Sequence, residues 1–242
     1  MERRKVSKNK NGGWFRRFVF GDMTPHEAYR YFINIIFPNI CPCCEEIIDY
    51  DEDFCESCTD KIVRCSDERH IEYADEFVAY CYYEKGARAA ILKFKKDACG
   101  NSYYAFASAI VKALQEKQLL SQIDVVVYLP MSKKEEKSRG YNLVKLIAKE
   151  IHYMLEIPCV NALYKTRTTF KQKELNGRDR KTNLIGAYKV FDNVELNGKC
   201  VLVVDDLCTT GSTLSEAARA LKDGGAEKVI AATFAKTKNI ES

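Results

Sequence analysis

The side chains with the clearest chemical potential lie between residues 205 and 213. An apolar run, Val201–Val204, leads into two adjacent carboxylates, Asp205 and Asp206. A turn of hydroxyls and glycine follows, made of Thr209, Thr210, Gly211, Ser212 and Thr213. We expect a helix to begin at this turn, where backbone N–H groups and the helix dipole suit a phosphate dianion. The carboxylates can accept hydrogen bonds from vicinal ribose hydroxyls, so the pattern predicts a ribose-phosphate site.

Cysteines form a second chemical cluster. The pairs Cys41/Cys44 and Cys55/Cys58 each have Cys-x-x-Cys spacing, and ten residues separate them. Four thiolates at this spacing can surround one Zn²⁺ and fill every coordination position, which predicts a structural metal. The alternatives are a reduced, buried set of cysteines and, less in keeping with the surrounding sequence, a redox pair. Cys43 could compete with Cys44 as a ligand.

The elements that must position these residues follow from the hydrophobic pattern. From residue 77 onward, apolar strand-like runs alternate with helical patterns, which predicts an α/β fold with a mostly parallel sheet and flanking helices. Ligands bind such sheets at the carboxyl ends of the strands. The segment 165–183 is polar and turn-rich and predicts a long loop. The expected strands cover 77–83, 124–129, 187–191, 201–204 and 229–234, and the helices 87–94, 103–118, 143–155 and 214–223.

The chain before residue 77 divides into three segments. Residues 1–21 are basic and without periodicity, which predicts a disordered tail. Residues 22–40 predict an amphipathic helix, with Thr24 as N-cap and Glu27 completing a capping box. Residues 41–76 then form the predicted zinc ribbon, followed by one larger domain over 77–238.

Composition limits the possible locations of the protein. The 242 residues carry a net charge of +4 and 11 cysteines, with no recognisable export signal. Clustered cysteines without export favour metal binding in a reducing cytosol over disulfides. The apolar stretch Tyr31–Ile40 falls short of the ~20 residues that cross a bilayer. We therefore expect a cytoplasmic protein without a membrane span.

The stretch 201–213 resembles the signature of type I phosphoribosyltransferases that binds phosphoribosyl pyrophosphate (PRPP). This resemblance implies that Asp205 and Asp206 hold the ribose 2′- and 3′-hydroxyls and that the turn from Thr209 to Thr213 holds the 5′-phosphate. Cys208 stands where an aliphatic residue is common, a change that leaves a cradle of backbone groups intact.

Further motifs resemble the competence protein F (ComF) family. Ser138–Asn142 is similar to its Arg-Gly-Phe-Asn element, Ala87–Lys95 to its helix ending in lysine, and Phe37-Pro38 before Cys41 to its amino-terminal zinc ribbon. Its loop motif is matched by Thr169, Gln172, Leu175, Arg180 and Asn183. The resemblance covers roughly 77–236 and implies a type I phosphoribosyltransferase fold preceded by a small four-cysteine zinc ribbon. Many members of the family carry a second cysteine pair before the transferase domain. This chain has only Cys65 and then Cys81 there, so we expect a single zinc.

The resemblance also implies a pyrophosphate side of the site. The family's Pro-Val-Pro turn reads Tyr128-Leu129-Pro130 here, so only Pro130 is retained. Arg139 would flank the pyrophosphate and Arg180 would lie on the loop that covers the ligand, which would bring Mg²⁺ with it. Lysines on the same side are Lys133, Lys134 and Lys137.

Three functional hypotheses remain open on the sequence. The first is a phosphoribosyltransferase with an unknown nitrogenous acceptor. The second is a non-enzymatic protein that handles single-stranded DNA with the DNA-uptake machinery in natural transformation. Its basic segments would be 165–181 and the tail, where Trp14, Phe15 and Phe18 are interleaved with cations. The third is a regulator that senses PRPP.

Overall fold

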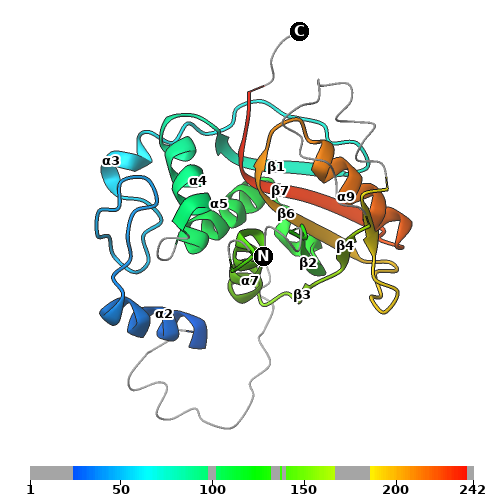
Figure 1. Cartoon of the computed structure of the whole chain (residues 1–242), viewed down its shortest axis with the longest axis horizontal. Coiled ribbons are helices and arrows are strands. Elements are labelled where there is room, and N and C mark those ends of the chain that lie inside the picture. The colour runs from blue at the N-terminus through cyan, green and yellow to red at the C-terminus, as the bar shows by residue number, and fades with distance from the viewer. Residues whose placement is uncertain (1–23, 98–101, 132–136, 138–139, 167–185, 239–242) are drawn as a thin grey trace. The chain divides into compact units, whose positions relative to one another are not determined.

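A parallel sheet forms the centre of the unit that spans residues 39–242 (Figure 1). The computed structural model describes residues 24–97, 102–131, 137, 140–166 and 186–238. Within these residues the main sheet has five strands in the order β1, β7, β6, β2, β3, and every neighbouring pair is parallel. This confirms the predicted fold class. The strands are β1 (Glu76–Tyr82), β2 (Val125–Tyr128), β3 (Cys159–Val160), β6 (Cys200–Cys208) and β7 (Lys228–Lys236).

Helices cover both faces of this sheet, and successive residues of β6 enter opposite cores. Leu202 and Val204 pack with one group of helices, whereas Val201 and Val203 pack on the other side. Because both faces are buried, the strand is a continuous apolar run in the sequence. The first face carries α4 (Lys85–Asp97), α5 (Ser102–Glu116) and α7 (Leu143–Leu155), and the second carries α9 (Ser212–Asp223).

The connections change direction between β2 and β6. Helix α7 leads from β2 to β3 along one face, and α9 leads from β6 to β7 along the other. Open α/β sheets bind ligands where neighbouring strands are continued in opposite directions in this way. The residues that follow these two strands, from Leu129 and from Thr209, therefore occupy the position expected of a ligand site.

The cysteine segment shares a core with the sheet. The ring of Phe54 stacks on Phe234 of β7 with centroids 6.0 Å apart. The carboxylate of Asp53 accepts hydrogen bonds from Ser108 and Lys112 of α5, at 2.9 and 2.5 Å. The segment also carries the short helix α3 (Glu56–Thr59). Residues 39–71 are thus built into the same unit as the sheet.

The part of the first unit that the structure describes consists mainly of helix α2 (Pro25–Ile36). The capping box lies where the sequence predicts it. The hydroxyl of Thr24 accepts from the backbone N–H of Glu27 at 3.2 Å, and the Glu27 carboxylate accepts from the backbone of Thr24 at 2.6 Å. No helix within the described ranges is long and apolar enough to cross a bilayer.

Two boundaries differ from the sequence-based expectation. The predicted end of the strand at Val204 is wrong, because β6 pairs with β7 as far as Cys208, which lies opposite Lys236. The expected loop over 165–183 begins too early, because Lys165 belongs to strand β4, which pairs antiparallel with β5. Residues 167–185 of that loop lie outside the described residues. The ribbon is formed by β4 (Leu163–Lys165) and β5 (Tyr188–Val190), and a 3-10 turn η1 (Leu120–Gln122) precedes β2.

Candidate phosphate site and metal centre

The acidic pair lies inside β6, immediately beyond the point where β2 ends. Strand β2 pairs with β6 as far as Val204, so from Asp205 onward β6 keeps only β7 as its neighbour. Asp206 is buried, with 6% of its surface exposed, whereas Asp205 is half-buried. The backbone N–H of Asp206 donates to Oδ1 of Asp205 at 2.8 Å. The two carboxylates therefore interact with each other in the part of β6 that lies beyond β2.

A lysine from α4 completes this acidic site. Lys95 Nζ lies 2.8 Å from Oδ2 of Asp206. Ala87, Ile91 and Phe94 are buried in the core on the adjoining part of the same helix surface, which fixes the orientation of α4 and so directs Lys95 toward Asp206. Lys95 is not among the site residues that the sequence predicts. The available signal was the similarity of Ala87–Lys95 to the helix of the ComF family that ends in lysine.

Burial and crowding of charge change the protonation of this site. Burial, reinforced by the neighbouring charge of Asp206, raises the pKa of Asp205 to about 8. Burial alone would lower the pKa of Lys95, but the charges of Asp206 and Asp205 outweigh it and raise that pKa. Near neutral pH, Lys95 is thus a cation paired with Asp206, and Asp205 holds a proton.

The turn after β6 has the geometry of an anion cradle. Gly211 is the N-cap of α9 and has a left-handed φ of 83°, a conformation that costs glycine little. The hydroxyls of Thr210 and Ser212 lie 3.0 Å apart, and both Thr209 and Thr210 are exposed. The predicted residues from Thr209 to Thr213 are therefore gathered at the amino end of α9, directly after the acidic pair.

The turn after β2 is braced by α7. Asn142 is the N-cap of α7, where its Oδ1 accepts from the backbone of Lys145 at 3.1 Å. Its Nδ2 also donates to the carbonyl of Leu129 at 3.2 Å, next to the half-buried Pro130. The residues that replace the family's Pro-Val, Tyr128 and Leu129, are buried in the two opposite cores. Of the predicted cations, Lys137 is exposed, while Lys133, Lys134, Arg139 and Arg180 lie outside the described residues.

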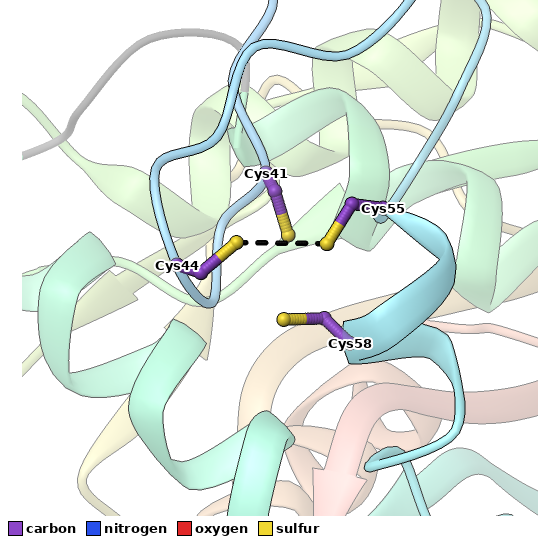
Figure 2. A group of neighbouring side chains, drawn as sticks. All are labelled: Cys41, Cys44, Cys55 and Cys58. Atoms are coloured by element: carbon purple, nitrogen blue, oxygen red, sulfur yellow. Dashed lines mark hydrogen bonds between the residues drawn. The ribbon is translucent and has the colours of Figure 1, made fainter.

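The four predicted cysteines converge on one point (Figure 2). Their sulfur atoms all lie within 4.8 Å of one another. Ligands 2.3 Å from a tetrahedral zinc would place their sulfurs ~3.8 Å apart, so the group fits such an ion. Burial would raise the pKa of the Cys41 thiol, but hydrogen bonds from backbone amides of the neighbouring cysteines outweigh it and lower that pKa to about 7. These amides favour the thiolate, the form that binds metal. The residues brought together are Cys41, Cys44, Cys55 and Cys58.

Cys43 lies outside this four-sulfur group. Its thiol donates to the carbonyl of Gly86 at 3.3 Å, at the start of α4. Burial raises the pKa of Cys43 to about 12, which keeps it a thiol. Cys65 is half-buried beside β1, and its backbone N–H bonds to the carbonyl of Tyr80 at 3.4 Å. Within the described structure, the geometry favours Cys44 over Cys43 as the fourth ligand.

Known proteins are similar to the part of the chain that carries the acidic pair and the turn after it. The family model described as "Phosphoribosyl transferase domain" matches residues 137–241. Competence protein F of Haemophilus influenzae is 32% identical over 108 residues, which are 44% of this chain and 47% of that protein. DNA utilization protein YhgH of Escherichia coli is 33% identical over 107 residues, which are 44% and 46% of the two chains.

A third relative extends the matched region. Competence protein ComFC of Bacillus subtilis is 30% identical over 143 residues, which are 58% of this chain and 50% of that protein. The matched stretches span about half the length of these curated relatives. The region matched by the family model includes the acidic pair and the turn that follows it. Over this region the chain is similar to competence proteins F and ComFC and carries a phosphoribosyl transferase domain.

Proposed function

We propose that this protein binds PRPP as its Mg²⁺ complex and acts in the cytoplasm as a phosphoribosyltransferase-like protein of natural competence. One observation carries the proposal. The carboxylate pair of β6 is followed directly by a turn that leads into the amino end of α9, at the edge where the connections of the sheet change direction. A ribose 5-phosphate presents vicinal hydroxyls and a dianion in the same molecule, which matches the two parts.

The acidic pair would recognise the ribose ring. Asp206 can accept a hydrogen bond from one hydroxyl, and Asp205, with its proton, can donate to the second hydroxyl as well as accept from it. Lys95 keeps a positive charge beside them, so two carboxylates can share a small buried space. The turn at Gly211 would bind the 5′-phosphate through backbone N–H groups and hydroxyls.

The proposed reaction is a displacement at C1 of the ribose. A nitrogen of the acceptor forms the new bond as the C1–pyrophosphate bond breaks and its electron pair leaves with pyrophosphate. The ring passes through an oxocarbenium-like state, as in glycoside cleavage. Mg²⁺ and cations from Arg139 and Arg180 would neutralise the leaving group. The acceptor would approach C1 from the face opposite the pyrophosphate.

The four-cysteine group would hold a structural zinc ion. Zinc favours four thiolates in tetrahedral arrangement, and a filled set leaves no position for substrate. In this proposal the metal fixes the segment 41–58 against α4 and α5, and the chemistry takes place at β6.

Calorimetric titration with PRPP and Mg²⁺ tests the proposal. We expect saturable binding by the wild type and at least ~100-fold weaker binding by Asp205→Asn/Asp206→Asn, since hydrogen bonds to charged groups contribute about 1.5–3 kcal/mol each. The charge-matched control is Asp60→Asn/Asp192→Asn, in which both carboxylates are exposed and lie outside β6 and α9. Absence of binding by a folded, zinc-loaded wild type would overturn the proposal.

A second function, single-stranded DNA handling, is favoured by the names of the relatives and by α4. This helix exposes Lys85, Arg88 and Lys96, which recur at helical spacing along one side. Such a stripe suits a phosphate backbone. The two functions are compatible, and PRPP could also regulate DNA binding rather than serve as a substrate.

A further inference from the structure

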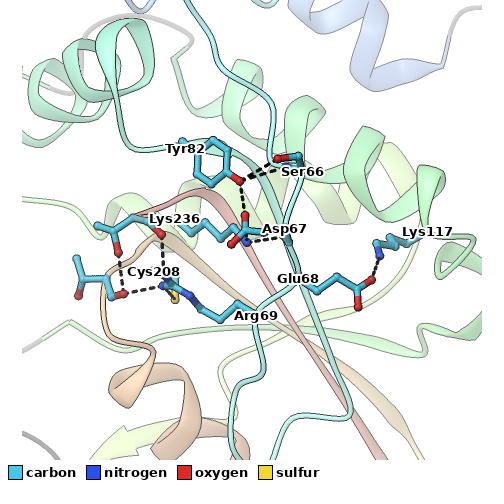
Figure 3. Close-up of polar contacts among 10 residues, drawn as sticks. Ser66, Asp67, Glu68, Arg69, Tyr82, Lys117, Cys208 and Lys236 are labelled. Atoms are coloured by element: carbon cyan, nitrogen blue, oxygen red, sulfur yellow. Dashed lines mark hydrogen bonds and ion pairs between the residues drawn. The ribbon is translucent and has the colours of Figure 1, made fainter. Parts of the chain in front are cut away.

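The segment between the cysteine group and β1 reaches the phosphate turn. Arg69 donates from Nη1 to the carbonyl of Thr209 at 2.7 Å and from Nη2 to the carbonyl of Thr237 at 2.6 Å (Figure 3). Nη1 also lies 3.6 Å from the sulfur of Cys208. The hydroxyl of Thr237 donates to the same Thr209 carbonyl at 2.9 Å. One carbonyl of the turn is therefore held by a guanidinium and a hydroxyl together.

Holding this carbonyl fixes the direction of the next N–H group. In a planar trans peptide the C=O and the following N–H point in opposite directions. With its carbonyl bound to Arg69, the Thr209–Thr210 peptide directs its N–H away from the segment 66–71. A guanidinium bond to a carbonyl is charge-assisted and stronger than a neutral one. Arg69 therefore fixes the direction of the Thr210 N–H before any ligand binds. The turn then needs no rearrangement of this peptide to donate to an anion.

Ile71 contacts the same turn from a second position. A Cβ added to Gly211 would lie 2.5 Å from Cδ1 of Ile71, well inside van der Waals contact. Ile71 is buried, with 3% of its surface exposed, in the core formed with α9. The segment therefore forms a wall behind Gly211, in addition to its polar bond at Thr209.

The segment is anchored firmly enough to act as a brace. Lys236 of β7 is 2% exposed, and its Nζ bonds to the carbonyl of Asp67 at 2.7 Å and to its carboxylate at 2.9 Å. The hydroxyl of Tyr82 donates to Asp67, and it accepts from the backbone of Ser66 at 3.3 Å. Further back, the backbone of Tyr82 donates to the carbonyl of Val63 at 2.8 Å. These contacts connect the segment 66–71 to β1 and β7 and, through Ile62 and Cys58 in the shared core, to the cysteine group.

We propose that residues 66–71, defined here as the brace, are a working part of the phosphate site, with Arg69 as a positioning residue for the 5′-phosphate. The inference rests on the proposed function, because it assigns the turn to ribose 5-phosphate. Arg69 and Ile71 precede the region 137–241 that the family model matches. The phosphate site is therefore completed by the segment that follows the cysteine group.

Calorimetric titration with ribose 5-phosphate tests the role of Arg69. We expect Arg69→Ala to bind about 10-fold to 100-fold more weakly than the wild type, in line with the loss of a charge-assisted hydrogen bond. Arg69→Lys should recover only part of the loss, because an ammonium group cannot reproduce the fork that reaches Thr209 and Thr237 together. The matched control is Arg64→Ala, which removes an arginine of the neighbouring segment that bonds to Tyr80 and Glu116 instead.

Phosphorus NMR of ribose 5-phosphate at saturation separates positioning from general weakening. With Arg69→Ala we expect the resonance of the bound 5′-phosphate to move toward that of the free ligand, while Arg64→Ala leaves it in place. Wild-type affinity in a folded Arg69→Ala protein overturns the brace and leaves the proposed function standing. Failure of the wild type to bind ribose 5-phosphate overturns both. Circular dichroism and zinc content establish that each variant is folded.

Discussion

The proton on Asp205 makes the acidic pair sensitive to pH. An unfolded aspartate has a pKa near 3.9, whereas burial and the charge of Asp206 raise the pKa of Asp205 to about 8 in the folded chain. Between these values the folded state binds a proton that the unfolded state has released. Raising the pH through this window therefore costs stability, and the loss is complete once the pH exceeds about 8.

We expect Asp205→Asn to remove this pH dependence. The amide keeps the shape and the acceptor for the Asp206 backbone but cannot ionise. From pH 5 to pH 8.5 the wild type should lose about 4 kcal/mol of stability relative to the variant. Thermal denaturation at the two pH values measures the difference, with Asp223→Asn on the exposed end of α9 as control. If the stability of the wild type and of Asp205→Asn changed equally with pH, the raised pKa of Asp205 would be contradicted.

At the scale of the element, α4 serves two sides of the molecule. Its buried side packs Phe94 against Phe106 of α5, with ring centroids 4.8 Å apart, and places Lys95 on Asp206. Its outer side carries Lys85, Arg88 and Lys96. A DNA strand lying along α4 would therefore pass next to Lys95, which pairs with Asp206 of the proposed ribose site.

If single-stranded DNA binds along α4, its affinity should fall steeply with salt. Each phosphate contact to a single strand adds about 0.7 to the slope of log K against log salt. The triple variant Lys85→Ala/Arg88→Ala/Lys96→Ala should thus lower that slope by roughly 2. Fluorescence anisotropy with a labelled oligonucleotide measures it. The charge-matched control, Lys117→Ala/Lys149→Ala/Lys189→Ala, changes exposed lysines of other elements and should leave most of the slope intact. Equal slopes in both triple variants would exclude α4 as the contact surface.

Elements and local motifs were accessible from sequence, whereas distant contacts were not. The turn at Gly211 and the cysteine pairs consist of residues close together in the sequence, so their spacing predicts them. The helix over Leu143–Leu155 follows from the helical period of its apolar residues. The length of β6 depends on its pairing with β7, which no local pattern encodes. Lys95 and Arg69 reach the site only through tertiary packing, so local spacing did not select them, and the one sequence signal was the resemblance of Ala87–Lys95 to the ComF helix that ends in lysine.

At the scale of the whole molecule, the proposed metal site and the sheet share one core. The core on one side of the sheet contains Cys41, Cys55 and Cys58 together with Phe106 and Phe234. A metal released from the cysteines would leave thiols or thiolates in this core, and the residues around them would lose their fixed positions. Because a metal bound only by the folded state adds its binding energy to folding, removal should weaken the whole unit.

Neighbouring cysteines provide a direct test of this link. We expect Cys44→Ser to lose zinc and to lower stability by more than about 3 kcal/mol. Cys43→Ser should retain zinc, since Cys43 bonds to Gly86 and a serine hydroxyl can make the same bond. Zinc release to a chromophoric indicator and thermal denaturation are measured on the same samples. Loss of zinc from Cys43→Ser but not from Cys44→Ser would reverse the ligand assignment.

The contact between Ile71 and Gly211 has a consequence for how the sequence can change over time. The two positions are far apart in the chain, yet the absence of a side chain at one makes room for the branched side chain at the other. Left-handed backbone at Gly211 restricts that position further. In diverging descendants of this gene, position 71 should therefore tolerate only side chains that leave the turn its space. We therefore expect the residue types at positions 71 and 211 to vary together among related sequences.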